Sequence, residues 1–463
     1  MPSNLTPRFD IDALESRTLL SGVPSASLRA VAADPLPVQS VPLNANISRL
    51  ADNQSEGAIA IDPTNPDRVF ALSNIEFGAG VAASVSTDGG VTWSTRVIGN
   101  GKDTLPRACC DPTVAFDEAG NLYAGYMDVR KNSLHILTSS NGGVTFRRLM
   151  TFTGDVDQPT ITTGAGTVWV TFQKDGRIAA SGARVAGLGT IGKFSRMQFV
   201  PGVTDGNFGD IAIGPNGQVM VTWLNPIDSI TPSDIYVSID RNGLSAGGFG
   251  KPVFVTATGV AAFRPIRAQR NATIDAEPGL AWDRSGGIAH GRVYMVYTVG
   301  SRSRGNHDTS IVLRQSSDDG VTWSRPIRVN DDATKTSQFL PRIALDQTTG
   351  NLAMNWHDSR NDRGVRPKST NLAVNDDAEF WGVVAQPTAG GVILSPNFQI
   401  SAGTSNAERS GNGIDFGDYT GLAFHAGVML PHWADNSNST GDNPDGKLRT
   451  LDMYTARITP VFA

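Results

Sequence analysis

The sequence predicts an all-β fold, a β-propeller of seven four-stranded blades, and three observations support that prediction. A short apolar strand, a Gly/Asp/Asn turn and a second apolar strand ending in an aromatic residue recur seven times. A second, glycine-containing hairpin phrase recurs three times between later strands. The 463 residues include 50 Gly and 39% hydrophobic residues, a globular composition that excludes disorder and collagen. Because repeats can absorb a long chain, one domain can hold all of them.

Each repeat is expected to supply a third strand and usually a fourth. The copies begin at Glu56, Asp111, Gln158, Asp210, Glu277, Pro341 and Tyr419. Third and fourth strands follow the pair, as at 134–138 and 146–152, 235–239 and 252–256, and 311–315 and 326–329. Four antiparallel strands make one propeller blade. Six blades remain an alternative if one degenerate copy, such as the third, is an insertion.

The two ends of the chain are expected to share the last blade. The seventh repeat has a third strand at 451–458 but little chain left for a fourth, whereas an apolar stretch at 38–44 precedes the first repeat. Pairing these segments removes an exposed sheet edge, which closed propellers favour. We therefore expect one domain over residues 37–463, closed by an amino-terminal strand.

Composition and charge exclude several classes of protein. The 39 Lys and Arg residues against 44 Asp and Glu give a net charge of -5, and the basic residues are scattered, so nucleic acid is not an expected partner. No run of about 18 apolar residues is present, so we expect no transmembrane segment. The six histidines show no zinc-ligand spacing.

The only two cysteines, Cys109 and Cys110, are adjacent and cannot form a disulfide framework. A disulfide between them, a rigid turn or a packing contact are three interpretations that the sequence leaves open.

Residues 1–36 are expected to be a leader outside the core. Within them, the segment 14–21, Leu-Glu-Ser-Arg-Thr-Leu-Leu-Ser, resembles a short Leu-Glu-x-Arg-x-Leu-Leu-Ser motif found near the start of many bacterial surface and secreted proteins. The resemblance implies export to the cell surface or the medium. The alternative is an amphipathic stretch with no address function.

The second repeat is Ser-x-Asp-x-Gly-x-Thr-Trp, at 86–93, 139–146 and 316–323. A short Asp or Asn accepts backbone N–H bonds in a tight hairpin, glycine permits positive φ, and the aromatic residue can tuck between sheets. The phrase is the Asp box, and the chain from about residue 38 to 463 resembles the sialidase-type (BNR repeat) propellers. Its principal residues, expected to be structural, are Asp88, Trp93, Asn141, Phe146, Asp318 and Trp323.

The first strand of each propeller blade lines a central channel, where ligands usually bind. Carboxyl side chains stand at the start of six of these strands: Glu56, Asp111, Asp157, Asp210, Glu277 and Asp418. Carboxylates that converge repel one another, which raises some pKa values or recruits a cation such as Ca²⁺. Alternatively, each acid caps its own strand end.

Resemblance to sialidases implies candidate catalytic residues. That family uses a Tyr nucleophile assisted by Glu, an Asp acid/base and three Arg that bind the substrate carboxylate. The order Glu277, Arg302, Arg342, Tyr419 resembles the family's Glu, Arg, Arg, Tyr. The early Arg-Ile-Pro signature is absent, and Glu56 stands in its place.

The resemblance assigns Tyr419 as nucleophile and Glu277 as its base, with Asp111 as a third catalytic candidate. The candidate substrate-binding residues are Arg342, Arg302, Arg360, Arg130, Asp358 and Asp418.

Two functions follow from these predictions. The first is an exported glycoside hydrolase of exo-α-sialidase type, and the second is a noncatalytic surface propeller that binds a glycan, a protein or Ca²⁺. Another propeller chemistry, such as a polysaccharide lyase or a hydrolase with two carboxylates, is a third alternative. We expect a monomer with a glycan or glycoprotein partner and no required cofactor.

Overall fold

A computed structural model of the protein describes residues 41–76, 80–226, 231–300, 308–460 and 462, all within the unit Leu36–Ala463. The predicted leader with its motif and the candidate Arg302 lie outside the described residues. Within those ranges the chain is built of strands, and its one helix is the 3-10 turn η1 (Ala407–Ser410). No helix in this part of the chain is long and apolar enough to cross a membrane.

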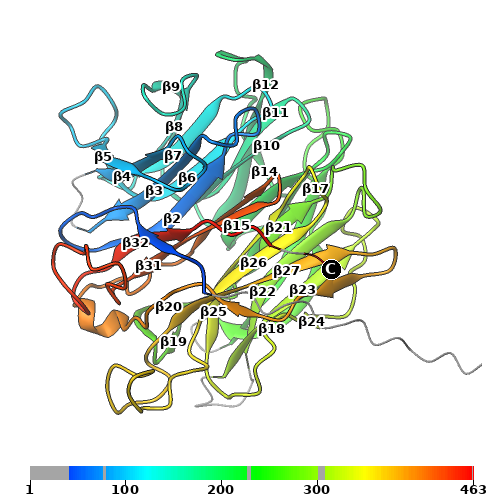
Figure 1. Ribbon diagram of the computed structural model, residues 1–463. Helices are drawn as coiled ribbons and strands as arrows, with labels where there is room; N and C mark the ends of the chain where they lie inside the picture. The colour runs from blue at the N-terminus through cyan, green and yellow to red at the C-terminus, as the bar shows by residue number, and fades with distance from the viewer. Residues whose placement is uncertain (1–40, 77–79, 227–230, 301–307, 461, 463) are drawn as a thin grey trace, which may run out of the picture. The chain divides into compact units, whose positions relative to one another are not determined.

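Seven antiparallel sheets follow one another along the chain as propeller blades (Figure 1). Blade 1 is β2 (Gln54–Ile61), β3 (Val69–Ile75), β4 (Val81–Ser86) and β5 (Ser94–Ile98). Blade 2 is β6 (Ala108–Phe116), β7 (Leu122–Asp128), β8 (Ser133–Ser139) and β9 (Arg147–Thr153). Blade 3 is β10 (Val156–Gly164), β11 (Thr167–Lys174), β12 (Arg177–Gly187) and β13 (Thr190–Ile191), with β14 (Gln198–Phe199) also paired to β12. Blade 4 is β15 (Asn207–Ile213), β16 (Val219–Asn225), β17 (Pro232–Asp240) and β18 (Val253–Ala261).

The remaining blades complete the ring. Blade 5 is β21 (Gly279–Trp282), β22 (Val293–Gly300), β23 (Thr309–Ser316) and β24 (Ile327–Arg328). Blade 6 is β25 (Gln338–Leu345), β26 (Leu352–Asp358), β27 (Glu379–Pro387) and β28 (Val392–Leu394), with β29 (Phe398–Gln399) also paired to β27. Blade 7 is β30 (Gly421–His425), β31 (Val428–Asp435), β32 (Asp452–Ala456) and β1 (Asn44–Asn46). The seven-blade prediction is confirmed, and the third repeat is a full blade rather than an insertion.

Closure by the amino-terminal side of the domain is also confirmed. β1 pairs with β32, with Asn44 opposite Ala456 and Asn46 opposite Tyr454. This strand begins at the last residue of the predicted 38–44 stretch. The outer edge of blade 7 is therefore supplied by chain that precedes blade 1, which ties the two ends of the domain together.

The Asp boxes form the hairpins between the third and fourth strands of blades 1, 2 and 5. In the first box, Asp88 accepts a hydrogen bond from the Thr92 backbone N–H at 2.9 Å, and Trp93 donates to the Gly90 carbonyl at 3.0 Å. A Cβ added at Gly90 would lie 3.0 Å from Leu430 of β31, in the preceding blade. The corresponding glycines of the other boxes, Gly143 and Gly320, would meet Phe70 of β3 and Met220 of β16 in the same way. The box glycine therefore allows each hairpin to pack closely against the blade before it.

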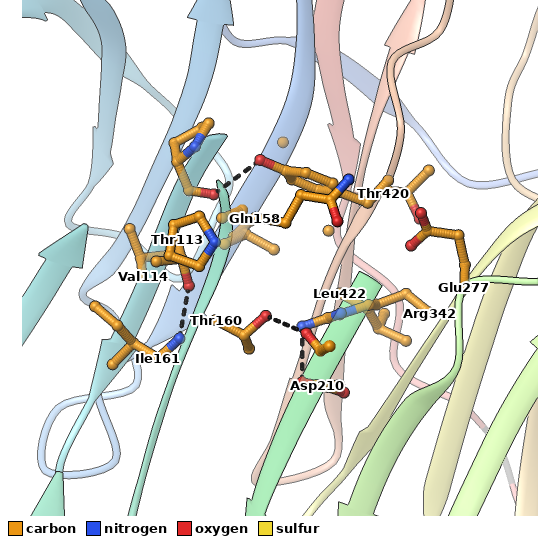
Figure 2. Close-up of a pocket in the computed structure, with 18 of the residues that line it drawn as sticks. Thr113, Val114, Gln158, Thr160, Ile161, Asp210, Glu277, Arg342, Thr420 and Leu422 are labelled. Carbon is orange, nitrogen blue, oxygen red and sulfur yellow. Dashed lines mark hydrogen bonds and ion pairs between the residues drawn. The ribbon is translucent and has the colours of Figure 1, made fainter. Parts of the chain in front are cut away.

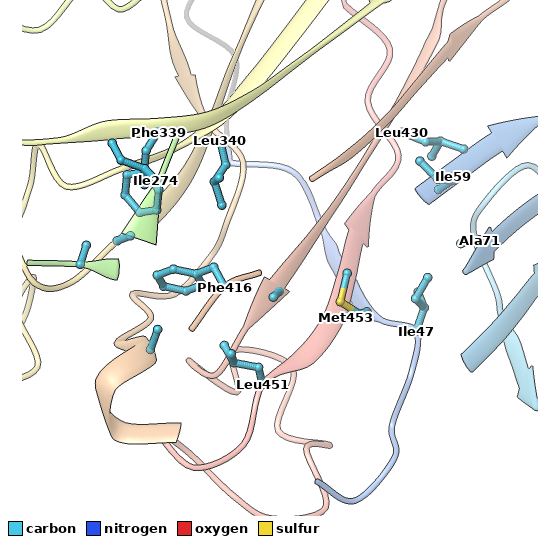
Figure 3. Packing of buried hydrophobic residues seen from close by; sticks show 14 of the residues in the cluster. Ile47, Ile59, Ala71, Ile274, Phe339, Leu340, Phe416, Leu430, Leu451 and Met453 are labelled. Atoms are coloured by element: carbon cyan, nitrogen blue, oxygen red, sulfur yellow. The ribbon is translucent and has the colours of Figure 1, made fainter. Parts of the chain in front are cut away.

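One element was not expected from the repeats. A hairpin of β19 (Arg264–Ile266) and β20 (Gln269–Ile274) lies between blades 4 and 5. Its Ile274 belongs to the apolar cluster of Phe339 and Phe416 (Figure 3). Its Gln269 side chain donates to the Gly417 carbonyl at 2.9 Å, just before blade 7. The hairpin therefore links distant blades on the face where the first strands begin.

Candidate functional site

The first strands carry a recurring irregularity that shapes the channel wall. Registers with the second strands slip between Ser55 and Ala58 in β2, and at equivalent points in β6, β10, β15 and β25. Residues in these slips, or just before β21, have positive φ although they are not glycine: Glu56, Asp111, Gln158, Glu277 and Leu340. Four of the five precede proline and one precedes glycine. A bulge of this kind bends the strand and re-aims a side chain, so the repeats present one set of side chains at the same level.

We call the residues at these slips the upper level of the channel wall. The residues two positions further along each first strand form a second level. Asp210, opposite Thr222, and Arg342, opposite Asn355, occupy the register of Ala58 and Thr113 in the first two blades. Glu277 and Tyr419 belong to the upper level, because each stands two residues before the second-level position of its blade. In blade 6 the upper-level position is held by Leu340, and the predicted substrate ligand Arg342 lies two residues further along, at the second level.

A cavity of about 130 Å³ lies between these first strands (Figure 2). Its polar lining comes from blades 2 to 7 and includes Gln158, Asp210, Glu277, Arg342 and Tyr419. Five side chains that are distant in sequence are therefore brought to one small space. Of the predicted catalytic residues, the structure places Glu277 and Tyr419 on its wall, and Asp111 next to Pro112, which also lines it.

Arg342 is held in place by a carboxylate. Its guanidinium lies 3.9 Å from Asp210 Oδ1. Asp210 also accepts a 2.7 Å hydrogen bond from the Leu280 backbone N–H of blade 5, so it joins two first strands. Among the residues that the structure describes, Arg342 is the one cationic side chain that lines the cavity.

Glu277 is the cavity group whose bonding is incomplete. Its Oε1 is buried and accepts no hydrogen bond. Burial, followed by the charges of Asp418 and Asp275, raises the pKa of Glu277 well above its usual range, and Arg342 lowers it only in part. The Glu277 carboxyl therefore favours its protonated form far more than an exposed glutamate does, and in that form it can donate a proton to a bound molecule.

Tyr419 projects its hydroxyl toward blade 2 and donates a long 3.5 Å hydrogen bond to the Pro112 carbonyl (Figure 2). Burial raises the pKa of this phenol well above its usual range, and the neighbouring acids Glu56, Asp111, Asp418 and Glu277 add to the effect whenever they are ionised. The phenol is therefore neutral unless a neighbouring carboxylate takes its proton.

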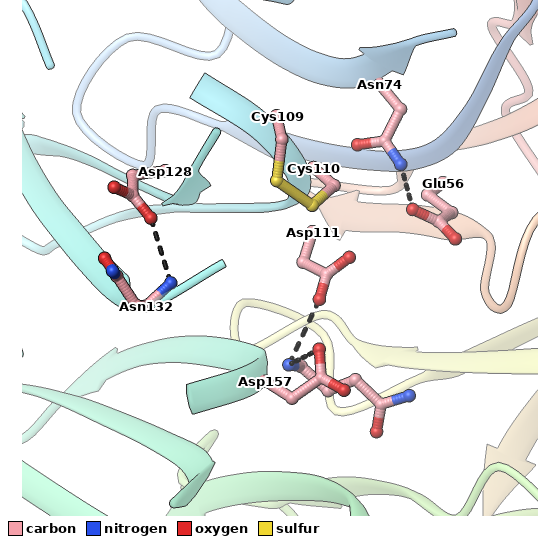
Figure 4. Close-up of a disulfide and its surroundings, with 9 residues drawn as sticks. Glu56, Asn74, Cys109, Cys110, Asp111, Asp128, Asn132 and Asp157 are labelled. Carbon is pink, nitrogen blue, oxygen red and sulfur yellow. Dashed lines mark hydrogen bonds between the residues drawn. A yellow bond between two sulfur atoms is a disulfide. The ribbon is translucent and has the colours of Figure 1, made fainter. Parts of the chain in front are cut away.

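Beside Tyr419 lies a carboxyl cluster, which we define as Glu56, Asp111, Asp157 and Asp418. The Asp111 and Asp157 carboxylates both accept a hydrogen bond from the Gln158 backbone N–H, at 3.2 and 3.1 Å, which brings the two acids side by side (Figure 4). Glu56 accepts from the Asp418 backbone N–H at 3.3 Å and from the Asn74 side chain. Blades 1, 2, 3 and 7 thus contribute one acid each.

The carboxyl groups of the cluster differ in pKa. Burial, and then Asp418, raise the pKa of Glu56 to about 8. Burial raises the pKa of Asp111 well above its usual range, and Glu56 and Asp157 add to the effect. For Asp418, burial followed by Asp157 raises the pKa to about 6, so this group is mainly ionised at pH 7. At neutral pH the cluster therefore contains both proton donors and a proton acceptor.

Cys109 and Cys110 form a disulfide immediately before Asp111 (Figure 4). Both residues are half-buried in the first strand of blade 2. Of the three interpretations that the sequence left open, the structure shows the disulfide.

Arg360 and Asp358, which were predicted to bind substrate, lie outside the cavity. The Arg360 guanidinium donates to Asp358 at 2.9 Å and Asp331 at 2.8 Å, and it lies 4.1 Å above the Trp381 ring. Asp358 also accepts from the Trp356 indole at 2.7 Å. These contacts fasten the loop after β26 to its own blade and to the segment between β24 and β25, so the charged groups of both residues are already bound by the protein.

The other candidates are separated from the cavity or undescribed. Arg130 is exposed in the turn after β7 and does not line the cavity. Arg302 falls in the undescribed segment 301–307. Asp418 is in the carboxyl cluster rather than on the cavity wall. Within the described residues, three guanidinium groups do not converge on Tyr419.

Sequence reasoning missed two features of the site. The Gln158 backbone N–H that Asp111 and Asp157 share could not be predicted, although both acids stood at strand starts. The anchoring role of Asp210 was also missed, because its partners Arg342 and Leu280 belong to other blades. The available signal was the recurring acid-Pro or Gln-Pro step, which marks the bulge.

Comparison with known proteins gives the following. No family model and no curated protein matches the sequence. Solved structures with a similar backbone include an unknown function protein from Dyadobacter fermentans, with 10% identity, a TM-score of 0.49 and coverage of 92% of this chain and 99% of that one. Polysaccharide lyase Uly1 has 10% identity, a TM-score of 0.49 and coverage of 85% and 88%. The phage phi92 endosialidase has 12% identity, a TM-score of 0.48 and coverage of 91% and 70%. Those activities belong to those proteins.

Proposed function

We propose that the protein acts on glycans and hydrolyses a glycosidic bond at the central cavity. The observation that carries the proposal is the Glu277 carboxyl, whose buried Oε1 lacks a hydrogen-bond partner in the cavity that Tyr419 also lines. A carboxylic acid kept protonated at neutral pH is the group that a departing sugar oxygen requires.

Proton transfer in the proposed reaction uses the cluster as base and Glu277 as acid. The ionised carboxylate of the cluster, Asp418 by its lower pKa, takes the Tyr419 proton directly or through its partners. The phenolate oxygen attacks the anomeric carbon while the glycosidic bond breaks, and Glu277 gives its proton to the leaving oxygen. Water then cleaves the tyrosyl-sugar bond, its proton restores Glu277, and the departing Tyr419 phenolate takes back the proton that the cluster held. In this scheme Glu277 is the acid, because its raised pKa suits donation better than the basic role first predicted.

The charge of the cavity restricts which kind of sugar can bind there. One guanidinium faces Glu277, Asp210 and the adjacent carboxyl cluster, and Asp210 already offsets that guanidinium. A carboxylate-bearing sugar would be repelled there unless several cations surrounded it. The proposal is therefore hydrolysis of a glycan at a neutral sugar unit, and exo-α-sialidase activity, the sequence-based prediction, is the alternative to be tested beside it.

A noncatalytic binding propeller is the second candidate. It is favoured by the four converging carboxyl groups, which could hold a glycan hydroxyl array or Ca²⁺ without any bond breaking. Export to the bacterial surface is part of both candidate functions, and the sequence motif in the leader is the observation that supports it.

The test is release of 4-methylumbelliferone by the full chain from its α-sialoside and from glycosides of neutral pentoses and hexoses, with and without Ca²⁺. Glu277→Gln and Tyr419→Phe are compared with Tyr236→Phe, a tyrosine of blade 4 that stacks on Trp223. Turnover that both cavity variants lose and Tyr236→Phe keeps supports hydrolysis. A folded protein that turns over none of these glycosides, but binds a glycan or Ca²⁺, supports the second candidate.

A further inference from the structure

A basic cleft lies away from the channel cavity, between loops of blades 6 and 7. It has a volume of about 1060 Å³. We define it by five cationic side chains that line it: Arg366, Lys368, Arg409, Lys447 and Arg449. All five are exposed, in a protein whose net charge is -5. This concentration of positive charge is opposite in sign to the channel.

The cations of the cleft are largely unneutralised. Lys368 lies 3.6 Å from Glu379, the carboxyl group in the lining. Within the described part of the chain, the other four side chains form no ion pair. Four uncompensated cations in one concave surface repel each other, so an anion bound between them gains favourable charge interactions with each.

The backbone beneath these side chains is fixed. Ser369 donates to Asp362 at 2.6 Å, and Thr370 donates through its hydroxyl to Asp377 at 2.6 Å. On the other wall, the Asn406 side chain accepts from the Arg409 backbone N–H at 3.2 Å. The Leu448 backbone N–H donates to the Asn436 carbonyl at 2.7 Å. Buried partners hold the loops, while the charged ends remain available to a ligand.

The cleft shares a face with the channel mouth. Gln338, at the start of β25, pairs with Asp358 at the end of β26, and Asp358 pairs with Glu379 at the start of β27. The loop that carries Arg366 and Lys368 joins β26 to β27, so it lies at the end of blade 6 where the first strand begins. The loop of Lys447 and Arg449 joins β31 to β32, at the corresponding end of blade 7.

We propose that this cleft binds acidic polysaccharide, through sulfate or carboxylate groups on successive sugar units. Its cations come from three separate segments, and its volume exceeds what one small anion fills, so a ligand with several anionic groups fits best. The lining contains no aromatic side chain on which a nucleic acid base could stack. The proposal goes beyond the proposed function, because the charged units would bind here and not in the acidic channel.

The experiment measures binding of fluorescent dextran sulfate and of neutral dextran to the full chain, at low and high salt. Lys447→Gln/Arg449→Gln removes two cations of the cleft. Lys251→Gln/Arg325→Gln removes two exposed cations from the outer hairpins of blades 4 and 5, so it changes the net charge equally. We expect salt-sensitive binding of dextran sulfate only, about tenfold weaker in the cleft variant and within about twofold of the wild type in the control.

Equal loss in both double variants, equal binding of neutral dextran, or tighter binding of oligothymidylate than of dextran sulfate would each overturn the proposal. Tyr419→Phe separates it from the proposed function. Retained dextran sulfate binding by that variant supports a site independent of hydrolysis, whereas loss of binding would place the anion in the channel and contradict the cleft.

Discussion

The Asp boxes and the central channel both contain acidic side chains, but the two surroundings shift the pKa of a carboxyl group in opposite directions. In the first box, hydrogen bonds from the Thr92 hydroxyl and backbone, then from Ser86, lower the pKa of Asp88 to about 2. In the channel, burial and neighbouring acids raise the pKa of Glu56 to about 8. Donors surround the first carboxylate and acids surround the second. An acid surrounded by donors is a structural part of its hairpin, while acids that face one another keep protons available for chemistry.

The largest expected effect falls on the channel. Glu277→Gln should lower kcat for glycoside hydrolysis by about 10² to 10⁴, because the amide cannot donate an acidic proton. The loss should be smaller for substrates with a better leaving group, which need less protonation. A fluorogenic assay with a series of aryl glycosides measures this. A uniform loss across the series would argue that Glu277 only positions the substrate.

Arg360→Ala should destabilise the protein without acting on chemistry. Its guanidinium is buried, with 9% of the residue exposed, and it forms ion pairs with Asp358 and Asp331. Removing it leaves a buried carboxylate uncompensated, at a cost of about 3 to 5 kcal/mol of unfolding free energy. Urea unfolding gives the value. Unchanged stability together with a raised KM would restore Arg360 to the substrate site.

These two expectations show where sequence reasoning succeeded and where it stopped. The seven blades, the closing strand and the Asp boxes were predictable because each follows from local alternation and turn residues that repeat. The roles of Arg360 and Asp210 were not, because their partners are set by tertiary packing. In sequence, Arg360 stands near a strand end, where a substrate-binding arginine is also expected. Its contacts with Asp331 and Trp381, which the sequence does not reveal, show that it binds other parts of the protein.

A pH effect on stability should follow from Glu56. Its pKa rises from 4.5 when unfolded to about 8 when folded, so the native state binds more protons between these values. The stability of the wild type should therefore fall as pH rises from about 4.5 to 8, by at most about 1.4 kcal/mol per pH unit for this group, and then level off. Glu56→Gln should flatten that part of the profile. Thermal unfolding between pH 5 and 8 is the measurement, and an identical slope in both proteins would be inconsistent with the raised pKa.

The smallest effect should come from an Asp box. Asp318→Ala removes acceptors for the Thr322 backbone and hydroxyl on an exposed hairpin. Water can replace those bonds, so we expect Tm to fall by only about 1 to 3 °C, with hydrolysis unchanged. Calorimetry and the same glycoside assay test this together. A large loss of activity would mean that the boxes reach the site.

The most direct test of the contrast between the two regions is the infrared spectrum of the protein at pH 7, in the region of the protonated carboxyl C=O stretch. Our account predicts such a band, reduced in Glu56→Gln and in Glu277→Gln, and unchanged in Asp88→Asn. A spectrum that shows only ionised carboxylates at pH 7 would contradict it, because the channel would then hold no proton to donate.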